Sequence, residues 1–277
     1  MSNIASFFYK HLPKDLIRYI GSRTYLRTIR DFLLRKNGVS KTIVVKAFWE
    51  PESLHFLFKT DIKTSIRAQT RGIESSLLKL SLKLLNYKST PNDKIIFDIG
   101  SSFGYLSMVW AKTAAKEGRV FAFEASRNVF ECLSYNVTSN EMQNRITALN
   151  QPVFNKSGMV LINDAPSSSH ISMDENGSLR TNTTEVNSVS IDDFCSTNEI
   201  DKIDLIKIDV DGVEFEILSG ATKSLQSIRP IIVVEPNEDL RIPDLMRSFD
   251  YELYDMHMNF YLPDGKLPNN LICIPKK

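Results

Sequence analysis

The chain has 277 residues, of which 42% are hydrophobic and 24% charged, and its formal net charge is +1. These proportions are ordinary for a soluble globular protein and allow one full domain with an appendage. No apolar run approaches the roughly 18–20 residues needed to cross a bilayer, so no membrane-spanning helix is expected.

The cysteines and the first residues bear on the compartment. Cys132, Cys195 and Cys273 have no metal-ligand spacing and leave an odd number for disulfides, which favours reduced thiols. Charged residues between positions 10 and 15 interrupt any apolar stretch, so no signal peptide is expected. We therefore expect a cytoplasmic protein.

The N-terminal part is basic. Residues 1–50 hold ten Lys+Arg and three Asp+Glu, a charge of +7, which leaves 24 − 30 = −6 for residues 51–277. Residues 15–36 are predicted to form a basic amphipathic helix, because apolar side chains recur at spacings of three and four. Such a helix can pack on the main domain with a solvated basic face. It can also make peripheral contact with an anionic membrane or bind an acidic partner.

Further along, alternating residues in 42–68 predict short strands with a turn at Glu50-Pro51, and residues 73–87 predict a leucine-rich helix. We expect a basic helical N-terminal extension with short strands over residues 1–65. The main domain is expected over residues 66–277.

The motif at residues 95–107 organises the main domain. An apolar run from Ile95 predicts a buried strand that ends at Asp98, and Gly100 and Gly104 bracket a turn. A helix is expected from residue 105 to residue 116, with Gly118 as its stop. In this layout backbone N–H groups face a ligand and glycine lets the ligand come close. The Asp98 carboxylate suits a ligand that carries an ammonium group.

Residues 100–104 also fit G-x-S-x-G, the nucleophile elbow of serine hydrolases, with Ser102 followed in order by Asp209 and His257. Glycine turns without any ligand are common as well. The next strand, residues 120–123, ends in Glu124, about twenty residues after the glycine turn, where it can accept both ribose hydroxyls of an adenosine. A hydrolase has no use for that carboxylate. S-adenosylmethionine (SAM) carries both an ammonium group and an adenosine, so the sequence favours a SAM site.

A helix over residues 126–136 and a third strand over residues 146–149 continue the alternation of strand and helix. This order predicts an α/β fold with a Rossmann-like, doubly wound, mostly parallel sheet and ligands at the carboxyl ends of its strands. Residues 155–187 break the rhythm and predict a hairpin or flap over the site, or a surface insertion. Three C-terminal pieces, 251–254, 260–262 and 270–274, predict an antiparallel hairpin on the sheet edge.

Carboxylates gather after two further predicted strands. Residues 203–208 run into Asp209 and Asp211, and residues 230–234 end in Glu235. Asp209 and Glu235 could hold a divalent cation in an oxygen-ligand site, act as base and hydrogen-bond acceptor, or bond loop amides. The sequence leaves these three interpretations open.

These motifs resemble a known family. Residues 97–105, Phe-Asp-Ile-Gly-Ser-Ser-Phe-Gly-Tyr, resemble motif I of class I SAM-dependent methyltransferases, and Phe-Ala-Phe-Glu at 121–124 resembles the acidic motif that follows. Residues 205–214, Leu-Ile-Lys-Ile-Asp-Val-Asp-Gly-Val-Glu, are similar to the signature of FkbM-type methyltransferases, which usually has Glu at the position of Asp211. The resemblance covers roughly residues 72–277.

The resemblance implies methyl transfer from SAM to an oxygen, commonly a sugar or polyketide hydroxyl. We expect a glycan or other small-molecule acceptor and no nucleic acid; the oligomeric state is open. The residues expected at the cofactor are Glu74, Asp98, Gly100, Ser101, Phe103, Gly104, Glu124, Ala125, Pro152 and Val153.

Within that set, Asp98 and the glycines would line the methionine end, Glu124 would bind the ribose, and Pro152 and Val153 would wall the adenine. Asp209 is the first candidate for a base that removes the hydroxyl proton, with Asp211 or His170 as alternatives. A non-catalytic SAM-fold module that docks through residues 1–50 is the remaining alternative.

Overall fold

The computed structural model describes residues 13, 39–45, 54–70, 72–86, 91–165, 168–171, 183–210, 212–263 and 265–276. The chain divides into two compact units, Met1–Ser75 and Ser76–Lys277. The predicted helix over residues 15–36 and the predicted turn at Glu50-Pro51 lie outside the described residues. Within the described ranges, no helix combines the length and the apolar character needed to cross a bilayer.

The first unit contains an antiparallel pair of strands. β1 (Val39–Val45) pairs with β2 (Leu54–Thr60) along its whole length, which confirms the predicted short strands. Residues 62–68 are not strand, because α4 (Ile62–Thr70) begins directly after Asp61. The Asp61 carboxylate caps this helix by accepting from the backbone N–H of Thr64 at 2.9 Å and from its hydroxyl at 2.6 Å.

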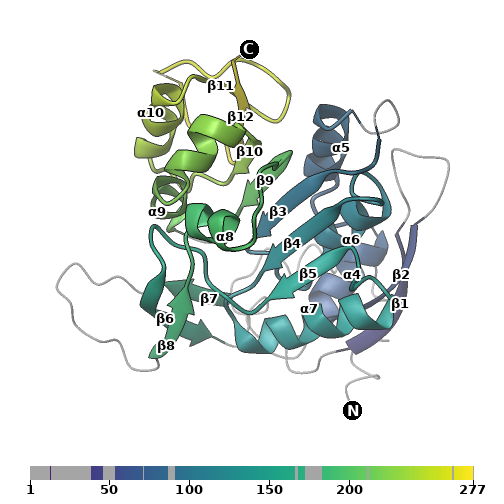
Figure 1. Cartoon of the computed structure of the whole chain (residues 1–277). Helices are drawn as coiled ribbons and strands as arrows, with labels where there is room; N and C mark the ends of the chain where they lie inside the picture. The colour runs from purple at the N-terminus through teal and green to yellow at the C-terminus, as the bar shows by residue number, and fades with distance from the viewer. Residues whose placement is uncertain are drawn as a thin grey trace. The chain divides into compact units, whose positions relative to one another are not determined.

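The second unit is built on a seven-stranded sheet with the order β11-β12-β10-β9-β3-β4-β5 (Figure 1). Five strands are parallel: β3 (Ile95–Ile99), β4 (Arg119–Phe123), β5 (Ile146–Leu149), β9 (Leu205–Ile208) and β10 (Ile231–Val234). β12 (Leu271–Pro275) is antiparallel to both β10 and β11 (Tyr251–Tyr254). The predicted mostly parallel sheet with an antiparallel C-terminal hairpin is confirmed. β12 lies inside the sheet, and β11 forms the edge.

Helices cover this sheet on both sides, as a doubly wound fold requires. Figure 1 shows α5 (Ser75–Leu84), α6 (Tyr105–Lys112) and α7 (Arg127–Ser139) on one side. On the other side lie α8 (Ile191–Thr197) and α9 (Glu214–Ser219). A short π-helix, η1 (Ser224–Ile228), packs with α8, and α10 (Arg241–Ser248) packs on β11. Neither η1 nor α10 was predicted.

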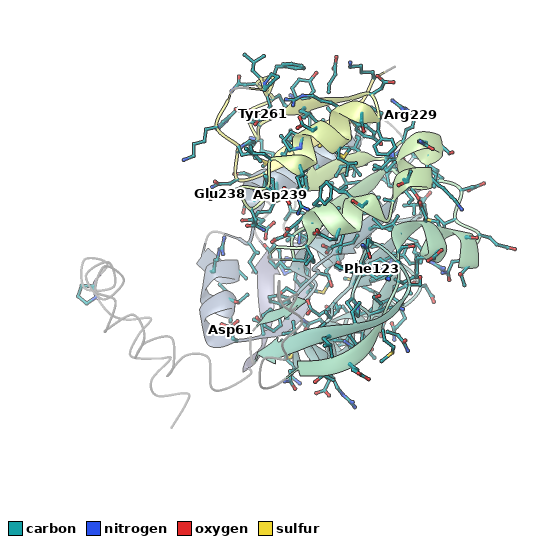
Figure 2. The ribbon with its side chains drawn as sticks, turned by 90° about the vertical axis from the view of Figure 1, so that its left-hand side faces the viewer. Asp61, Phe123, Arg229, Glu238, Asp239 and Tyr261 are labelled. Atoms are coloured by element: carbon teal, nitrogen blue, oxygen red, sulfur yellow. The ribbon has the colours of Figure 1, made fainter. Side chains whose placement is uncertain are left out.

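Aromatic side chains fill the core between the sheet and α8. The ring centroids of Phe97 and Phe121, on neighbouring strands, lie 5.2 Å apart. The ring of Phe194 from α8 packs edge-on against Phe123, with 5.0 Å between the ring centroids (Figure 2 labels Phe123). On the other face, the fully buried Trp110 of α6 donates its indole N–H to the Ser81 hydroxyl of α5 at 3.0 Å. Both faces of the parallel strands are therefore buried, which explains their continuous apolar sequences.

The strand order reverses between β3 and β9. The chain runs outward from β3 to β4 and β5, and then returns to place β9 on the other side of β3. In open α/β sheets, ligands bind beside the carboxyl ends of the strands at such a switch point. The fold therefore directs attention to the loops that follow β3, β4, β9 and β10.

α6 is shorter than predicted. It ends at Lys112, where the hydroxyl of Thr113 donates back to the Val109 carbonyl at 2.7 Å and the backbone leaves helical geometry. Gly118 is therefore not the helix stop. A Cβ at Gly118 would lie 2.1 Å from the Lys94 carbonyl oxygen, so this glycine lets the start of β4 approach the start of β3.

The region predicted as a hairpin, flap or insertion contains a second, antiparallel sheet with the order β7-β6-β8. Its strands are β6 (Gly158–Ala165), β7 (Ser168–Ile171) and β8 (Thr183–Ser188). β6 pairs with both neighbours. The pairing agrees with a hairpin over β6 and β7.

Candidate functional site

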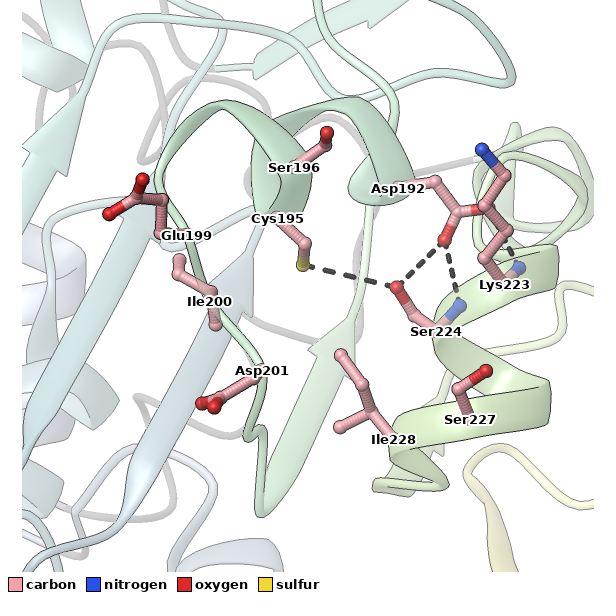
Figure 3. A pocket seen from close by; sticks show the side chains of 10 residues that line it. All are labelled: Asp192, Cys195, Ser196, Glu199, Ile200, Asp201, Lys223, Ser224, Ser227 and Ile228. Atoms are coloured by element: carbon pink, nitrogen blue, oxygen red, sulfur yellow. Dashed lines mark hydrogen bonds between the residues drawn. The ribbon is translucent and has the colours of Figure 1, made fainter.

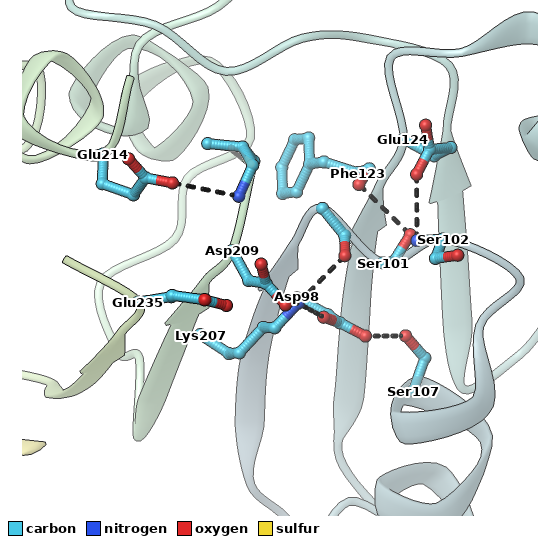
Figure 4. A network of polar contacts seen from close by, with 12 residues as sticks. Asp98, Ser101, Ser102, Ser107, Phe123, Glu124, Lys207, Asp209, Glu214 and Glu235 are labelled. Atoms are coloured by element: carbon cyan, nitrogen blue, oxygen red, sulfur yellow. Dashed lines mark hydrogen bonds and ion pairs between the residues drawn. The ribbon is translucent and has the colours of Figure 1, made fainter. Parts of the chain in front are cut away.

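Two ionisable side chains lie next to each other in the middle of the sheet. The register pairs Asp98 of β3 with Lys207 of β9, so both side chains lie on the same face. Asp98 is 1% exposed and Lys207 is 3% exposed. Each is the single polar residue in a strand that is otherwise apolar. Buried ions of this kind need partners, and Figure 4 shows the network that supplies them.

Asp98 uses its two oxygens differently. Oδ2 accepts from the hydroxyl of Ser107 on α6, whereas Oδ1 accepts no hydrogen bond among the described residues and lies 3.7 Å from the Lys207 ammonium. Burial raises the pKa of Asp98, and Lys207 and the Ser107 hydroxyl oppose that shift. One buried carboxylate oxygen is therefore able to accept a donor from a ligand.

The glycine turn after β3 is held against the end of β4. The N–H groups of Gly100 and Ser101 both donate to the Phe123 carbonyl, at 3.1 and 2.9 Å. Gly100 has a φ of +75°, and a Cβ there would lie 1.9 Å from the carbonyl oxygen of Asp209. The Phe103 carbonyl accepts from the amide of Asn136 on α7 at 2.9 Å. The turn is thus fixed from three sides before any ligand binds.

Glu124 lies at the tip of β4, directly beside this turn. Its carboxylate accepts from the backbone N–H group of Ser102 at 2.9 Å (Figure 4) and from that of Ser126 at 2.8 Å. Burial raises the pKa of Glu124 to about 7, although these two N–H donors act in the opposite direction. Each oxygen accepts one of these bonds and keeps further lone-pair capacity for a hydroxyl donor.

The segments after β4 and β5 are tied together. The side-chain amide of Asn150 donates to the carbonyls of Glu124 and Ala125 at 2.9 and 3.1 Å. Pro152 and Val153 are buried, and the Pro152 carbonyl accepts from Val189 at 3.1 Å. This places Ala125 next to Asn150, two residues before the predicted adenine wall.

Asp209 follows β9 and provides the second carboxylate beside the Lys207 ammonium. Its Oδ2 is 3.4 Å from the Lys207 ammonium and its side chain is 29% exposed. Lys207 also donates to the Gly100 carbonyl at 2.9 Å. The predictions did not include Lys207 in the site, although a lysine inside an otherwise apolar strand was a visible signal.

The positions of three further predicted residues relative to this network are not described. Asp211 lies outside the described residues. His170 lies on β7 opposite Asn163 of β6. Glu74 belongs to the first unit and has a φ of +45°. Their roles stay predictions.

A second carboxylate network supports the loops after β9 and β10. Glu214 is 2% exposed and accepts from the N–H groups of Val210 and Gly212 and from the Asn237 amide, the last at 2.9 Å. Asn237 and Glu238 have φ values of +45° and +66°, a conformation that is rare outside glycine. Figure 2 labels Glu238 beside Asp239 in this loop. Glu214 is thus a structural carboxylate that bonds loop amides.

The other chemistries considered from the sequence find little support. Among the described residues, no group of three or more His, Cys, Asp or Glu side chains could hold a metal ion. The hydrolase constellation is not assembled. The Ser102 N–H bonds Glu124, Asp209 pairs with Lys207, and the His257 N–H bonds Asp255 at 2.8 Å.

A hollow of about 580 Å³ lies elsewhere, near the amino end of β9, between α8 and η1 (Figure 3). Two of its polar side chains, those of Asp192 and Ser224, bond each other. Asp192 accepts from the N–H groups of Lys223 and Ser224, both at 2.8 Å, and from the Ser224 hydroxyl at 2.7 Å. Burial raises the pKa of the Cys195 thiol to about 11, so it is not a reactive thiolate at neutral pH. This hollow contains none of the predicted site residues.

Comparison with known proteins identifies a methyltransferase family model and relatives that are named as methyltransferases. Residues 98–253, more than half of the chain, match the family model described as Methyltransferase FkbM domain. Hexuronic acid methyltransferase AglP of Haloferax volcanii is 28% identical over 144 residues, which are 51% of this chain and 55% of AglP. The chain therefore spans about half the length of this curated relative.

Two solved structures are similar at lower identity. Methyltransferase FkbM from Methylobacillus flagellatus is 18% identical, with a TM-score of 0.45, over 66% of this chain and 44% of that chain. A putative rRNA-methylase from Clostridium thermocellum is 11% identical, with a TM-score of 0.44, over 73% of this chain and 96% of that chain.

Proposed function

The chain belongs to the FkbM family of methyltransferases, and we propose that it transfers a methyl group from SAM to a hydroxyl group of a sugar. The observation that carries this proposal is the buried Oδ1 of Asp98, which accepts no hydrogen bond among the described residues. This oxygen lies 3.7 Å from the Lys207 ammonium but has no hydrogen-bond donor in the described part of the chain, so it keeps capacity to accept one from a ligand. The ammonium of a methionine moiety is a donor of the right charge.

Four features among the other predicted cofactor residues support the same ligand: Glu124, the glycine turn, Pro152 and Val153. Glu124 lies at the tip of the strand next to Asp98, with lone pairs left for the two ribose hydroxyls. The turn from Gly100 to Gly104 separates these two carboxylates and precedes the N-terminus of α6. Pro152 and Val153 are buried apolar residues that suit a wall for the adenine.

SAM supplies a methyl group that is already activated by a sulfonium centre. The protein therefore mainly has to hold the acceptor hydroxyl in line with the methyl–sulfur bond. A carbon–oxygen bond forms, the carbon–sulfur bond breaks, and the hydroxyl proton must leave. We assign the orientation of that hydroxyl, and acceptance of its proton, to Asp209, which is partly exposed at the end of β9.

The choice of a sugar hydroxyl is supported by the relative. AglP is named for hexuronic acid, and it is 28% identical to this chain over 144 residues. Because the chain spans only 55% of AglP, the acceptor is proposed as a sugar and not as a particular uronic acid.

Calorimetric titration with SAM tests the cofactor half of the proposal. We expect the wild-type chain to bind SAM, and Glu124→Gln to bind it more weakly, because the amide cannot accept from ribose hydroxyls at both positions. Glu131→Gln is the matched control, because Glu131 is 67% exposed on α7. Absence of SAM binding by the folded wild-type chain would reject the proposal.

The acceptor half requires methyl transfer. The protein is incubated with SAM labelled in its methyl group and with oligosaccharides that end in either glucuronic acid or glucose. Label on a sugar oxygen, located by mass spectrometry and lost in Asp98→Asn, is the expected result. Binding of SAM without transfer to any glycan in the panel would favour the non-catalytic alternative.

Two further expectations remain part of this proposal. We keep the division into an extension over residues 1–65 and a catalytic domain over residues 66–277. We also propose that the charge of +7 on residues 1–50 gives a cytoplasmic protein peripheral contact with anionic membranes. Flotation of the full chain with anionic vesicles, but not with neutral ones, is the expected result. Equal flotation with both would contradict it.

A further inference from the structure

One ammonium group lies at the centre of the network in Figure 4. Lys207 Nζ donates to the Gly100 carbonyl at 2.9 Å and lies 3.4 Å from Asp209 Oδ2 and 3.7 Å from Asp98 Oδ1. The lysine side chain is 4% exposed. A cation that is removed from water to this degree is stable only because several acceptors surround it.

These acceptors belong to different parts of the proposed site. Asp98 and Gly100 belong to the side that would hold SAM, and Asp209 belongs to the side that would hold the acceptor hydroxyl. The backbone joins the same two sides, because Gly100 lies against the Asp209 carbonyl without room for a Cβ. Lys207 therefore lies between the two binding regions and contacts both.

We infer that Lys207 is a positioning residue that couples cofactor binding to the placement of Asp209. The inference rests on the proposed function, because it takes Asp98 as the cofactor-side carboxylate and Asp209 as the acceptor-side carboxylate. When a ligand ammonium approaches Asp98, repulsion from this second cation weakens the attraction of Lys207 to Asp98. The lysine then interacts more strongly with Asp209. Coupling of this kind is reciprocal, so a change at Asp209 must also change cofactor affinity.

The coupling predicts opposite effects of two substitutions on the pH dependence of SAM binding. The charged groups that face Asp98 are Lys207, Asp209 and Glu124. Lys207 lowers the pKa of Asp98 and of Glu124, whereas Asp209 raises the pKa of Asp98. SAM binding requires ionised carboxylates and therefore strengthens as pH rises through these pKa values.

The experiment is calorimetric titration of the full chain with SAM at a series of pH values from mildly acidic to mildly alkaline. In Lys207→Met, the rise in affinity should move to higher pH, with binding about tenfold weaker at the acidic end. In Asp209→Asn, the rise should move to lower pH. Lys207→Arg keeps the charge and should restore the wild-type position of the rise.

Matched controls make the same chemical changes outside the network. Lys202→Met removes a lysine that is 50% exposed at the amino end of β9, and Asp244→Asn removes an aspartate that is 83% exposed on α10. Neither control should change the pH at which SAM affinity increases. Lys207→Met leaves buried carboxylates without a cation and can prevent folding. In that case Asp209→Asn still tests the coupling, because the Asp209 side chain is 29% exposed and its replacement is compatible with folding.

The outcomes separate the inference from the proposed function. If the folded wild-type chain does not bind SAM, the proposed function fails and the inference fails with it. Suppose instead that the wild-type chain binds SAM, but the pH at which SAM affinity increases is unchanged or higher in Asp209→Asn. The coupling is then rejected, while the proposed function stands. A shift to lower pH in Asp209→Asn, with both controls unmoved, supports it.

Discussion

Gly100 and Asp209 are in direct backbone contact: a Cβ on Gly100 would lie 1.9 Å from the Asp209 carbonyl oxygen. The sequence predicted that this glycine makes room for a ligand. The structure gives it a different neighbour, the end of β9. The glycine turn and the β9 tip are therefore one packed unit, and the geometry of either depends on the other.

Gly100→Ala should destabilise the chain by about 2–4 kcal/mol, because a side chain would meet backbone and the φ of +75° disfavours alanine. Chemical denaturation measures this loss. Gly158→Ala is the control, since its φ is +142° and nothing lies within 4 Å of the added Cβ. That change tests backbone strain alone and should cost about 1–2 kcal/mol. Equal losses of stability in the two variants would show that the contact with Asp209 does not add to the cost of Gly100→Ala.

Glu124 should make the stability of the protein depend on pH. Burial raises its pKa from 4.5 to about 7, so in this window the folded state holds a proton that the unfolded state has released. Its contribution to stability is therefore lost as pH rises from about 4.5 to about 7, by roughly 1–3 kcal/mol. Urea denaturation should show this fall in the wild-type chain and a flatter curve in Glu124→Gln. A fall of the same size in Glu124→Gln would assign it to other groups.

Ser107→Ala should destabilise the chain by about 1–3 kcal/mol, because it leaves the buried Asp98 without its hydroxyl donor. It should also raise the pKa of Asp98 further, since the Ser107 hydrogen bond opposes the effect of burial. Denaturation and SAM titration are the measurements. Ser248→Ala removes an exposed hydroxyl that bonds the Leu245 carbonyl at 2.7 Å, and it should cost less than about 0.5 kcal/mol.

Asn237→Ala should loosen the loop between β9 and α9. Asn237 donates to Glu214 at 2.9 Å and has a φ of +45°, which asparagine tolerates better than alanine. We expect a loss of about 1–2 kcal/mol and faster hydrogen exchange of the Gly212 N–H, which Glu214 also binds. Asn198→Ala, at the end of α8, should leave that exchange rate unchanged. Unchanged exchange in both variants would show that Glu214 holds the loop without Asn237.

Local sequence was sufficient to predict the parallel strands and the position of Glu124. Each strand is a short apolar run, and Glu124 directly follows one of them. α10 was not predicted, and it contains Pro243, a residue that often breaks helices. It occupies the third position of the helix, where its absent N–H has no intrahelical partner to lose.

The ion network could not be predicted from local pattern. Lys207 and Asp98 are 109 residues apart and become neighbours only through the register of β9 with β3. The same is true of Gly100, whose neighbour is set by the path of the backbone after β9. Sequence identifies such residues as unusual in their strands, and tertiary pairing decides what they contact.

The position of β12 has a consequence for synthesis of the chain. β12 lies between β10 and β11, although residues 271–275 follow both in sequence. While the ribosome makes the chain, β10 therefore emerges with one edge unpaired, and β11 has no strand to join. The sheet closes only when residues 271–275 become available, so until then the β10 edge is open to chaperone binding or to pairing with another nascent chain.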